Sequence, residues 1–204
     1  MSCYSRHYYQ TLLCVCLLCA VYASNPSRSI SADVAPDVTL QAVVSERNVP
    51  LAAPEMLTVL IFHGEDTADA ASEVNFAIRQ AFPSASRVLI ASVVDLGFVP
   101  KMFHGLARDA MRSAFQKESN TYLPEGYDAS DYIVILPDWN GDVTEAFGFE
   151  DVDETLGVVV IEERGRVLLV EQADSTEPDE NLASAAITTV RRQLMTASRP
   201  GAGL

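Results

Sequence analysis

The stretch LTVLIFHGEDTADAASEVNFAIRQAFP, residues 57–83, has the pattern of a buried strand followed by a helix. Leu57–His63 is a continuous apolar run bounded by Gly64, which is typical of a strand covered on both faces. Asp69–Phe82 then places its apolar residues on one stripe at helical spacing, and Pro83 stops the helix. The stretch therefore predicts one strand-helix unit of an α/β domain.

Strands and helices continue to alternate after this unit. The expected strands are Val88–Val94, Tyr132–Leu136, Leu156–Ile161 and Arg166–Glu171, and the expected helices are Lys101–Lys117, Val143–Phe147 and Glu180–Met195. The order is β-α-β-α-β-α-β-β-α. Because strand-helix-strand crossovers are right-handed, this order predicts three parallel strands with helices on both faces. The terminal hairpin should run antiparallel on the other edge of a mixed sheet of about five strands.

The helix over Lys101–Lys117 shows the clearest helical spacing in the chain. One face carries the apolar residues Phe103, Leu106, Ala107, Ala110, Met111, Ala114 and Phe115. The other face carries His104, Arg108 and Arg112. We therefore expect Phe103, Leu106, Met111 and Phe115 to lie in the core, and His104 to be solvated.

The amino-terminal 23 residues are typical of a signal peptide. Thr11–Val21 is an apolar run that is too short for a stable membrane anchor, and Ala23 is a suitable cleavage position. We expect cleavage after Ala23 and a secreted or periplasmic protein with no stable membrane insertion afterwards. An uncleaved amino-terminal membrane anchor is the alternative. Lipidation is a further one, although Cys14 and Cys19 both follow Leu, where a lipoprotein signal needs a small residue.

Cysteine usage depends on this cleavage. All the cysteines of the chain lie before the expected cleavage position, at Cys3, Cys14, Cys16 and Cys19. A cleaved chain could use neither a disulfide nor a thiolate nucleophile.

Charge and composition limit the partners and divide the chain. The 204 residues carry 14 Lys and Arg against 28 Asp and Glu, a net charge of −14, which repels nucleic acid. Hydrophobic residues make up 49%, enough for a buried core. Residues 24–54 read as a leader or linker in which residues 37–47 could form one or two short edge strands. The α/β domain is expected over residues 55–197, followed by a flexible tail, residues 198–204.

The layout resembles the thioredoxin-like superfamily, in particular its redoxin and peroxiredoxin-type branch. PDWNGDVTEAFGF, residues 137–149, resembles that branch's D-x-x-G-x-x-x-x-x-[YF]-G stretch. TLGVVVIEERGRVLLV, residues 155–170, resembles its closing strand-turn-strand. The resemblance covers about residues 54–196 and implies a three-layer α/β/α sandwich.

The redox residues of that family are missing here. The resemblance implies redox cysteines just past the first core strand, and counting from Phe62 places them at Thr67 and Ala70. The family's cis-proline, eight residues before the hairpin glycine Gly165, falls on Gly157. The fold is therefore expected without the thiol chemistry.

Two weaker candidate sites remain. His63 ends a core strand beside Glu65, Asp66 and the expected redox position Thr67, where a ligand could bind. The favoured alternative is a structural histidine that is hydrogen-bonded to nearby acids or to the start of the helix.

Asp138, Asn140 and Asp142 have the 1-3-5 spacing of a calcium loop. Its sixth and twelfth positions hold Val143 and Phe149 instead of Gly and Glu, so a turn with a helix cap is favoured.

Two functions stay open. The first is an exported, non-redox domain that binds a protein or peptide through the vacated site and the helix face of Lys101–Lys117. The second is a redoxin-type enzyme with residual or metal-assisted activity at His63 and Thr67. No cofactor is expected for this chain.

Overall fold

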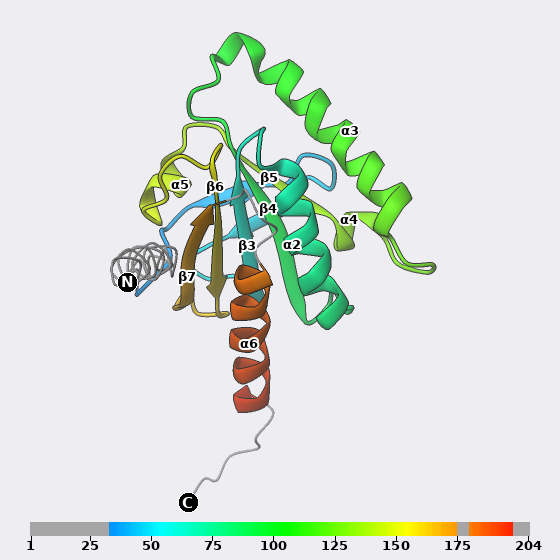
Figure 1. The fold of residues 1–204 in the computed structure, drawn as a ribbon, viewed down its shortest axis with the longest axis vertical. Helices are drawn as coiled ribbons and strands as arrows, with labels where there is room; N and C mark the ends of the chain where they lie inside the picture. The colour runs from blue at the N-terminus through cyan, green and yellow to red at the C-terminus, as the bar shows by residue number, and fades with distance from the viewer. Residues whose placement is uncertain (1–32, 175–179, 198–204) are drawn as a thin grey trace, which may run out of the picture.

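A five-stranded mixed sheet forms the centre of the molecule, with strand order β5-β4-β3-β6-β7 (Figure 1). The computed structural model describes residues 33–174 and 180–197; the expected signal peptide and carboxyl-terminal tail lie outside these residues. The strands are β3 (Leu57–His63), β4 (Val88–Asp95), β5 (Val134–Asp138), β6 (Thr155–Ile161) and β7 (Val167–Asp174). Strands β3, β4 and β5 are parallel, whereas β6 pairs antiparallel with both β3 and β7. The predicted parallel strands and antiparallel hairpin are confirmed.

Two long helices cover one face of this sheet. Helix α2 (Ala68–Ala81) and helix α6 (Glu180–Ala197) pack on β3, β4 and β6. Each helix turns one apolar stripe inward, as Val74 and Ile78 do in α2 and Ala186 and Val190 do in α6. Burying a side chain such as Ile78 contributes about 1.5–3 kcal/mol relative to leaving it exposed.

The opposite face is covered by an amino-terminal hairpin and a short helix. The hairpin consists of β1 (Thr39–Gln41) and β2 (Asn48–Pro50), and the helix is α5 (Asp142–Ala146). Leu40 and Val49 face each other across the hairpin and are buried against the sheet. The first strand lies within the expected residues 37–47, whereas the second lies just beyond them. The two strands pair with each other and lie over the sheet instead of extending its edge. This part of the expected linker belongs to the core.

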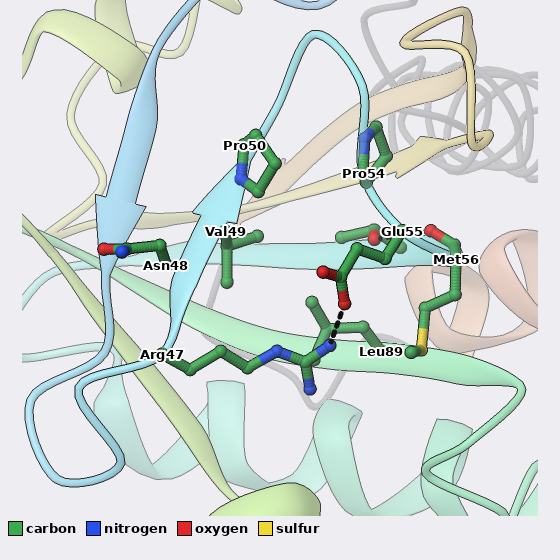
Figure 2. A pocket seen from close by; sticks show the side chains of 9 residues that line it. Arg47, Asn48, Val49, Pro50, Pro54, Glu55, Met56 and Leu89 are labelled. Atoms are coloured by element: carbon green, nitrogen blue, oxygen red, sulfur yellow. Dashed lines mark hydrogen bonds and ion pairs between the residues drawn. The ribbon is translucent and has the colours of Figure 1, made fainter.

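One small pocket lies between the hairpin and the sheet. Figure 2 shows the pocket between β2 and the start of β3, where the guanidinium of Arg47 lies 3.5 Å from a carboxylate oxygen of Glu55. The pocket has room for little more than one water molecule. It therefore offers no binding site for a small ligand.

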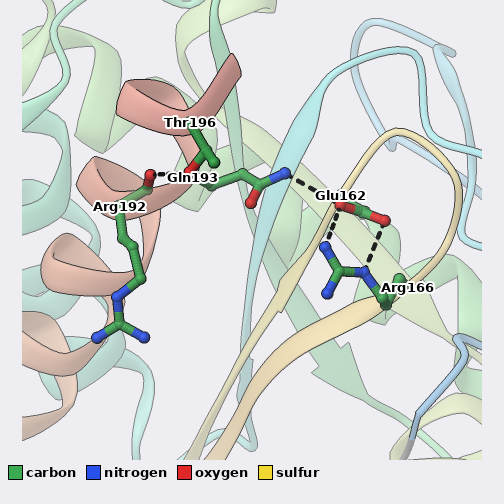
Figure 3. A network of polar contacts seen from close by, with 5 residues as sticks. All are labelled: Glu162, Arg166, Arg192, Gln193 and Thr196. Atoms are coloured by element: carbon green, nitrogen blue, oxygen red, sulfur yellow. Dashed lines mark hydrogen bonds and ion pairs between the residues drawn. The ribbon is translucent and has the colours of Figure 1, made fainter. Parts of the chain in front are cut away.

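The turn between β6 and β7 is tied to α6 by a polar network (Figure 3). Arg166 donates two hydrogen bonds of 2.8 Å to the two carboxylate oxygens of Glu162, and Gln193 of α6 donates a third, of 3.0 Å. The pKa of Glu162 lies below its usual value, mainly because Arg166 donates these hydrogen bonds to its carboxylate. The network fixes the hairpin end against the last helix.

Helix α3 packs differently from the sequence-based expectation. The segment begins as a 3-10 turn, Lys101–Phe103, and continues as α3 (His104–Tyr122) along the outside of the molecule (Figure 1). Met111 is buried and Phe115 is half-buried, as expected. Phe103 and Leu106 are 48% and 70% exposed, so their prediction as core residues is wrong.

Trp139 explains the orientation of α3. The His104 ring stacks on Trp139 with centroids 4.3 Å apart, and the Arg108 guanidinium lies 4.6 Å from the centre of the same ring. These contacts turn part of the polar face of α3 inward and leave Leu106 outside. The prediction that His104 is solvated is therefore wrong, since its ring is half-buried and its Nε2 lies 3.2 Å from the Val99 carbonyl oxygen.

A four-residue helix, α4 (Ala129–Tyr132), precedes β5 and was not expected. Asp128 caps it by accepting a hydrogen bond from the amide of Ser130. Across the described ranges, none of the helices combines the length and apolar character that a bilayer crossing requires.

Candidate functional site

The candidate site lies where β3 ends and α2 begins. His63 is the last residue of β3, and Gly64, Glu65, Asp66 and Thr67 lead into α2. Thr67 is the residue immediately before the helix, where free backbone N–H groups and the helix dipole favour negative charge. A helix end of this kind lowers the pKa of a thiol that faces it, and in this chain Thr67 holds the position.

The Thr67 side chain is buried and fully engaged. It is 1% exposed, and its hydroxyl donates a hydrogen bond of 2.7 Å to the Val152 carbonyl. The same oxygen accepts a bond of 3.0 Å from the Gly64 amide, which also donates to the Val152 carbonyl at 2.9 Å. Thr67 makes no side-chain capping bond to its own helix. Its hydroxyl therefore holds the start of α2 against the segment that precedes β6.

Asp153 closes the same loop from the outside. Its carboxylate accepts a hydrogen bond of 3.0 Å from the Glu65 amide. A Cβ atom on Gly64 would collide with the Asp153 carboxylate, so a larger residue here would displace that side chain from the Glu65 amide. Glu65 and Asp66 are exposed. The loop of residues 64–67 is thus packed against residues 152–153 and leaves no space between them for a ligand.

His63 is buried beside this loop. Its Nδ1 lies 2.8 Å from the Gly64 carbonyl oxygen, which requires Nδ1 to carry the proton. Burial lowers the pKa of His63, while the Gly64 carbonyl and the negative charge of Asp153 act in the opposite direction. The nearby acid that acts on the ring is thus Asp153, from a distant part of the chain.

The other two positions implied by the family resemblance lie apart from this loop. Ala70 is half-buried in the first turn of α2. Gly157 lies within β6, opposite Phe62, and a Cβ atom there would approach the Phe149 ring to 2.7 Å. The peptide bonds of the described residues are all trans. The segment that faces Thr67 across the site is Val152–Asp153.

Asp138, Asn140 and Asp142 form a turn and a helix cap. One Asp138 carboxylate oxygen accepts bonds from the amides of Val143 and Thr144, at 2.9 and 2.8 Å, and from the Thr144 hydroxyl at 3.0 Å. Asn140 donates to the Asp142 carboxylate at 3.2 Å. In residues 33–174 and 180–197, no three His, Asp or Glu side chains are placed to hold one metal ion.

Asp95 adds a second carboxylate at this edge of the sheet. It ends β4 and accepts a bond of 2.9 Å from the Gly97 amide. Burial raises its pKa, the Gly97 bond lowers it, and the charges of Asp138 and Asp153 raise it further. The carboxyl ends of the parallel strands therefore gather negative charge around a closed loop.

The residues that close the site have no recognisable pattern in the sequence. Val152 acts through its backbone carbonyl, which any residue would supply. Asp153 was one acid among several in an acidic stretch. Trp139 belonged to the quoted turn, but nothing in the pattern placed it under α3.

Comparison with known proteins supports the fold. No protein-family model matches the chain, and no curated protein matches it in sequence. The fold is similar to that of a peroxiredoxin 6 mutant from Arenicola marina, at 14% identity and a TM-score of 0.57, over 87% of this chain and 80% of that one. It is also similar to the yeast mitochondrial 1-Cys peroxiredoxin, at 14% identity and a TM-score of 0.56, over 87% and 83%.

A third similar structure is the exposed lipoprotein thioredoxin of Streptococcus pneumoniae, at 14% identity and a TM-score of 0.51, over 77% of this chain and 99% of that one. The chain therefore has a thioredoxin-like fold whose structural neighbours are peroxiredoxins and thiol-disulfide oxidoreductases. At this level of identity, the likeness concerns the fold alone.

Proposed function

We propose that this chain is a non-redox domain of thioredoxin-like fold that binds a protein partner through its surface. The observation that carries the proposal is Thr67, which occupies the start of α2 with a buried hydroxyl bonded to the Val152 carbonyl. Cysteine is absent from the sequence after residue 19, so no thiol is built into the described domain.

The hydroxyl of Thr67 is also poorly placed to act as a nucleophile. An alcohol becomes nucleophilic when a neighbouring base takes its proton. Here the proton is directed at a carbonyl oxygen, and His63 directs its own Nδ1 proton at the Gly64 carbonyl. The geometry therefore favours a structural role for both side chains over residual enzyme activity.

The surface suited to a partner lies on α3 and the loop before it. Exposed apolar side chains gather there, namely Phe98, Met102, Phe103 and Leu106. A contiguous exposed apolar patch is a common mark of a protein interaction site. The proposed partner thus binds on the outside of the domain, at the start of α3.

Peroxide consumption and disulfide reduction by the full-length chain test the absence of redox chemistry. We expect both rates to equal those of buffer with the same reductant. The matched control is the variant in which Cys3, Cys14, Cys16 and Cys19 are all replaced by Ser, because it removes every thiol of the chain. Peroxide consumption that persists in this variant and disappears in His63→Ala would overturn the proposal in favour of an enzyme.

We also propose that the protein is exported and cleaved after Ala23. The apolar run of Thr11–Val21 supports this. The mass and amino-terminal sequence of the protein recovered from its host test it, with Ser24 as the expected first residue. An intact amino terminus in a membrane fraction would show a retained anchor instead.

A further inference from the structure

Helix α3 is held on the domain by fewer buried side chains than α2. Met111 is the one buried residue among its 19 residues, whereas α2 buries four side chains among 14 residues. Residues 101–110, which comprise the 3-10 turn and the first half of α3, contain no buried residue. Figure 1 shows that α3 runs along the outside of the molecule. Segments with few buried contacts open locally while the rest of a protein stays folded.

The start of α3 also lacks features that stabilise a helix end. Phe103 occupies the position before the helix and makes no side-chain capping bond, which Ser, Thr, Asp or Asn would supply there. Gly105 lies in the first turn, and a Cβ atom on it would have open space around it, so packing does not require a glycine here. Because glycine favours the helical state about four- to fivefold less than alanine does, Gly105 weakens this turn.

Trp139 supplies the contacts that hold this half of the helix. The His104 ring stacks on it with centroids 4.3 Å apart, and the Arg108 guanidinium lies 4.6 Å from the centre of the same ring. An aromatic pair favours contact by about two- to tenfold, and a cation-π contact at an exposed site by about two- to fivefold. Both factors are small beside the equilibrium constant between the folded and unfolded states of a domain, which is about 10³–10⁸. The two contacts can therefore break while the sheet stays intact.

The second half of α3 is tied to α2 instead. The Ser72 hydroxyl donates a hydrogen bond of 3.0 Å to the Glu118 carboxylate, and the rings of Phe76 and Tyr122 lie 4.9 Å apart. These contacts and the buried Met111 hold the carboxyl-terminal half of the helix. A local opening is thus confined to the residues before Met111.

Such an opening separates the apolar side chains that form the partner surface. Phe98 lies in the loop after β4, where the Gly97 amide donates a bond of 2.9 Å to the Asp95 carboxylate at the end of that strand. The other three apolar residues of the surface belong to the 3-10 turn and to α3. When the start of α3 leaves the sheet edge, these three residues leave with it, and Phe98 stays behind.

We propose that His104 and Arg108 clamp the start of α3 on Trp139, and that opening of this clamp regulates the partner surface. With the clamp closed, the four apolar side chains lie on one surface. With the clamp open, that surface is divided between the loop after β4 and the released segment. The regulatory part of the inference rests on the proposed function, which places a partner on this surface. The clamp itself requires no partner.

Hydrogen exchange of backbone amides in the full-length chain tests the local opening. The amides of residues 108–111 bond within the first turns of α3, whereas residues 59–61 lie in the central strand β3. We expect the amides of residues 108–111 to be at least about tenfold less protected than those of residues 59–61. Their protection should also depend less on urea, because a local opening exposes little surface. Equal protection and equal urea dependence would overturn the inference, since α3 would then open only with the whole domain.

Variants test whether Trp139 is the clamp. Arg108→Ala should lower the protection of the α3 amides about two- to fivefold, and Gly105→Ala should raise it by up to about fivefold. In a Trp139→Leu background, Arg108→Ala should have less than about a 1.5-fold effect, because its contact is already lost. The matched control is Arg112→Ala, which removes an exposed arginine of the same helix that pairs with Asp109 at 2.9 Å, and it should change the protection less than about twofold.

The outcomes of these variants decide the role of the ring. An Arg108→Ala effect of the same size with and without Trp139, or no larger than that of Arg112→Ala, would overturn the clamp. Arg108→Ala and Gly105→Ala alter no buried side chain, so they test the clamp even if Trp139→Leu does not fold.

Distances between spin labels test the effect on the partner surface. In a background with all four native cysteines replaced by Ser, labels at Phe98→Cys and Leu106→Cys should give one narrow distance population and a second, broader one. The second population should grow in Arg108→Ala. A single population that Arg108→Ala leaves unchanged would overturn the regulatory part of the inference. These measurements use neither peroxide nor a partner, so this inference and the proposed function can fail separately.

Discussion

Replacing Thr67 by Val measures what the closed loop contributes to stability. Val keeps the branched shape and volume of Thr but removes the hydroxyl, which makes two buried hydrogen bonds, to the Val152 carbonyl and from the Gly64 amide. A buried neutral hydrogen bond has a net worth of about 0.5–1.5 kcal/mol. The Gly64 amide and the Val152 carbonyl still bond to each other, so neither is left without a partner. Thr67 makes no side-chain capping bond, so no capping energy is lost. We expect a loss of about 1–2 kcal/mol in the free energy of unfolding.

Urea unfolding followed by circular dichroism measures this loss. With an m-value of about 2 kcal/mol per M, the midpoint should fall by on the order of 0.5–1 M at unchanged m. The control is Thr121→Val in α3, where the hydroxyl is exposed and bonds only to the Lys117 carbonyl in its own helix. Its cost should be about 0.5 kcal/mol or less. Equal midpoints for Thr67→Val and the unchanged chain would refute the view that the Thr67 hydroxyl holds the loop closed.

Three further predictions follow from the geometry. In a background without native cysteines, Thr67→Cys should give a thiol with a pKa at or above the usual ~8.5, because the position is buried and faces a carbonyl oxygen. The rate of thiol alkylation as a function of pH measures this pKa, and a value below about 6 would contradict the closed site. Because burial lowers the pKa of His63 in the folded protein, the unfolded chain takes up a proton first as the pH falls below 6.5. The free energy of unfolding should therefore decrease below pH 6.5, and it should decrease less steeply in His63→Gln. Urea midpoints measured from about pH 7.5 to 5.5 test this. Met111→Ala should cost about 2–5 kcal/mol in the free energy of unfolding, whereas Leu106→Ala should cost about 0.5 kcal/mol or less. Thermal unfolding measures both, and similar losses would show that the helix faces are assigned wrongly.

The sheet and the two helices that cover it are predictable from the sequence, because their hydrophobic patterns each fit only one kind of element. The strand Leu57–His63 begins and ends at the predicted residues, since a strand buried on both faces is a continuous apolar run. Helix α2 differs from its prediction by one residue at each end, because a single stripe and Pro83 define it.

Helix α3 shows where this kind of reading stops. Its apolar arc is wide enough for two partners, and periodicity does not say which half the domain covers. The ring of Trp139 settles the matter by holding His104 and Arg108, a contact between residues about thirty positions apart. The packing of the amino-terminal hairpin is not predictable for a related reason, because strands of three residues carry too little alternation to show which side faces the core.

The sequence predicts where the helix after β3 begins, but not which residues surround its first turn. Counting from Phe62 leads to Thr67, the residue before α2. The acceptor of its hydroxyl is a backbone carbonyl 85 residues away, and a carbonyl leaves no trace in a residue pattern. The same holds for the fit of Gly64 against Asp153, which depends on two loops meeting in space.

The Gly64 amide donates a bifurcated hydrogen bond to the Thr67 hydroxyl and the Val152 carbonyl. Its proton therefore reports the order in which these segments assemble during folding. The amide cannot reach solvent until the segment before β6 separates from the segment after β3, so its hydrogen exchange records the parting of regions that are far apart in the chain. Such distant contacts close late in folding, since a long loop must be ordered before it gains them. We therefore expect Gly64 to gain protection only after α2 has formed and β6 has joined the sheet.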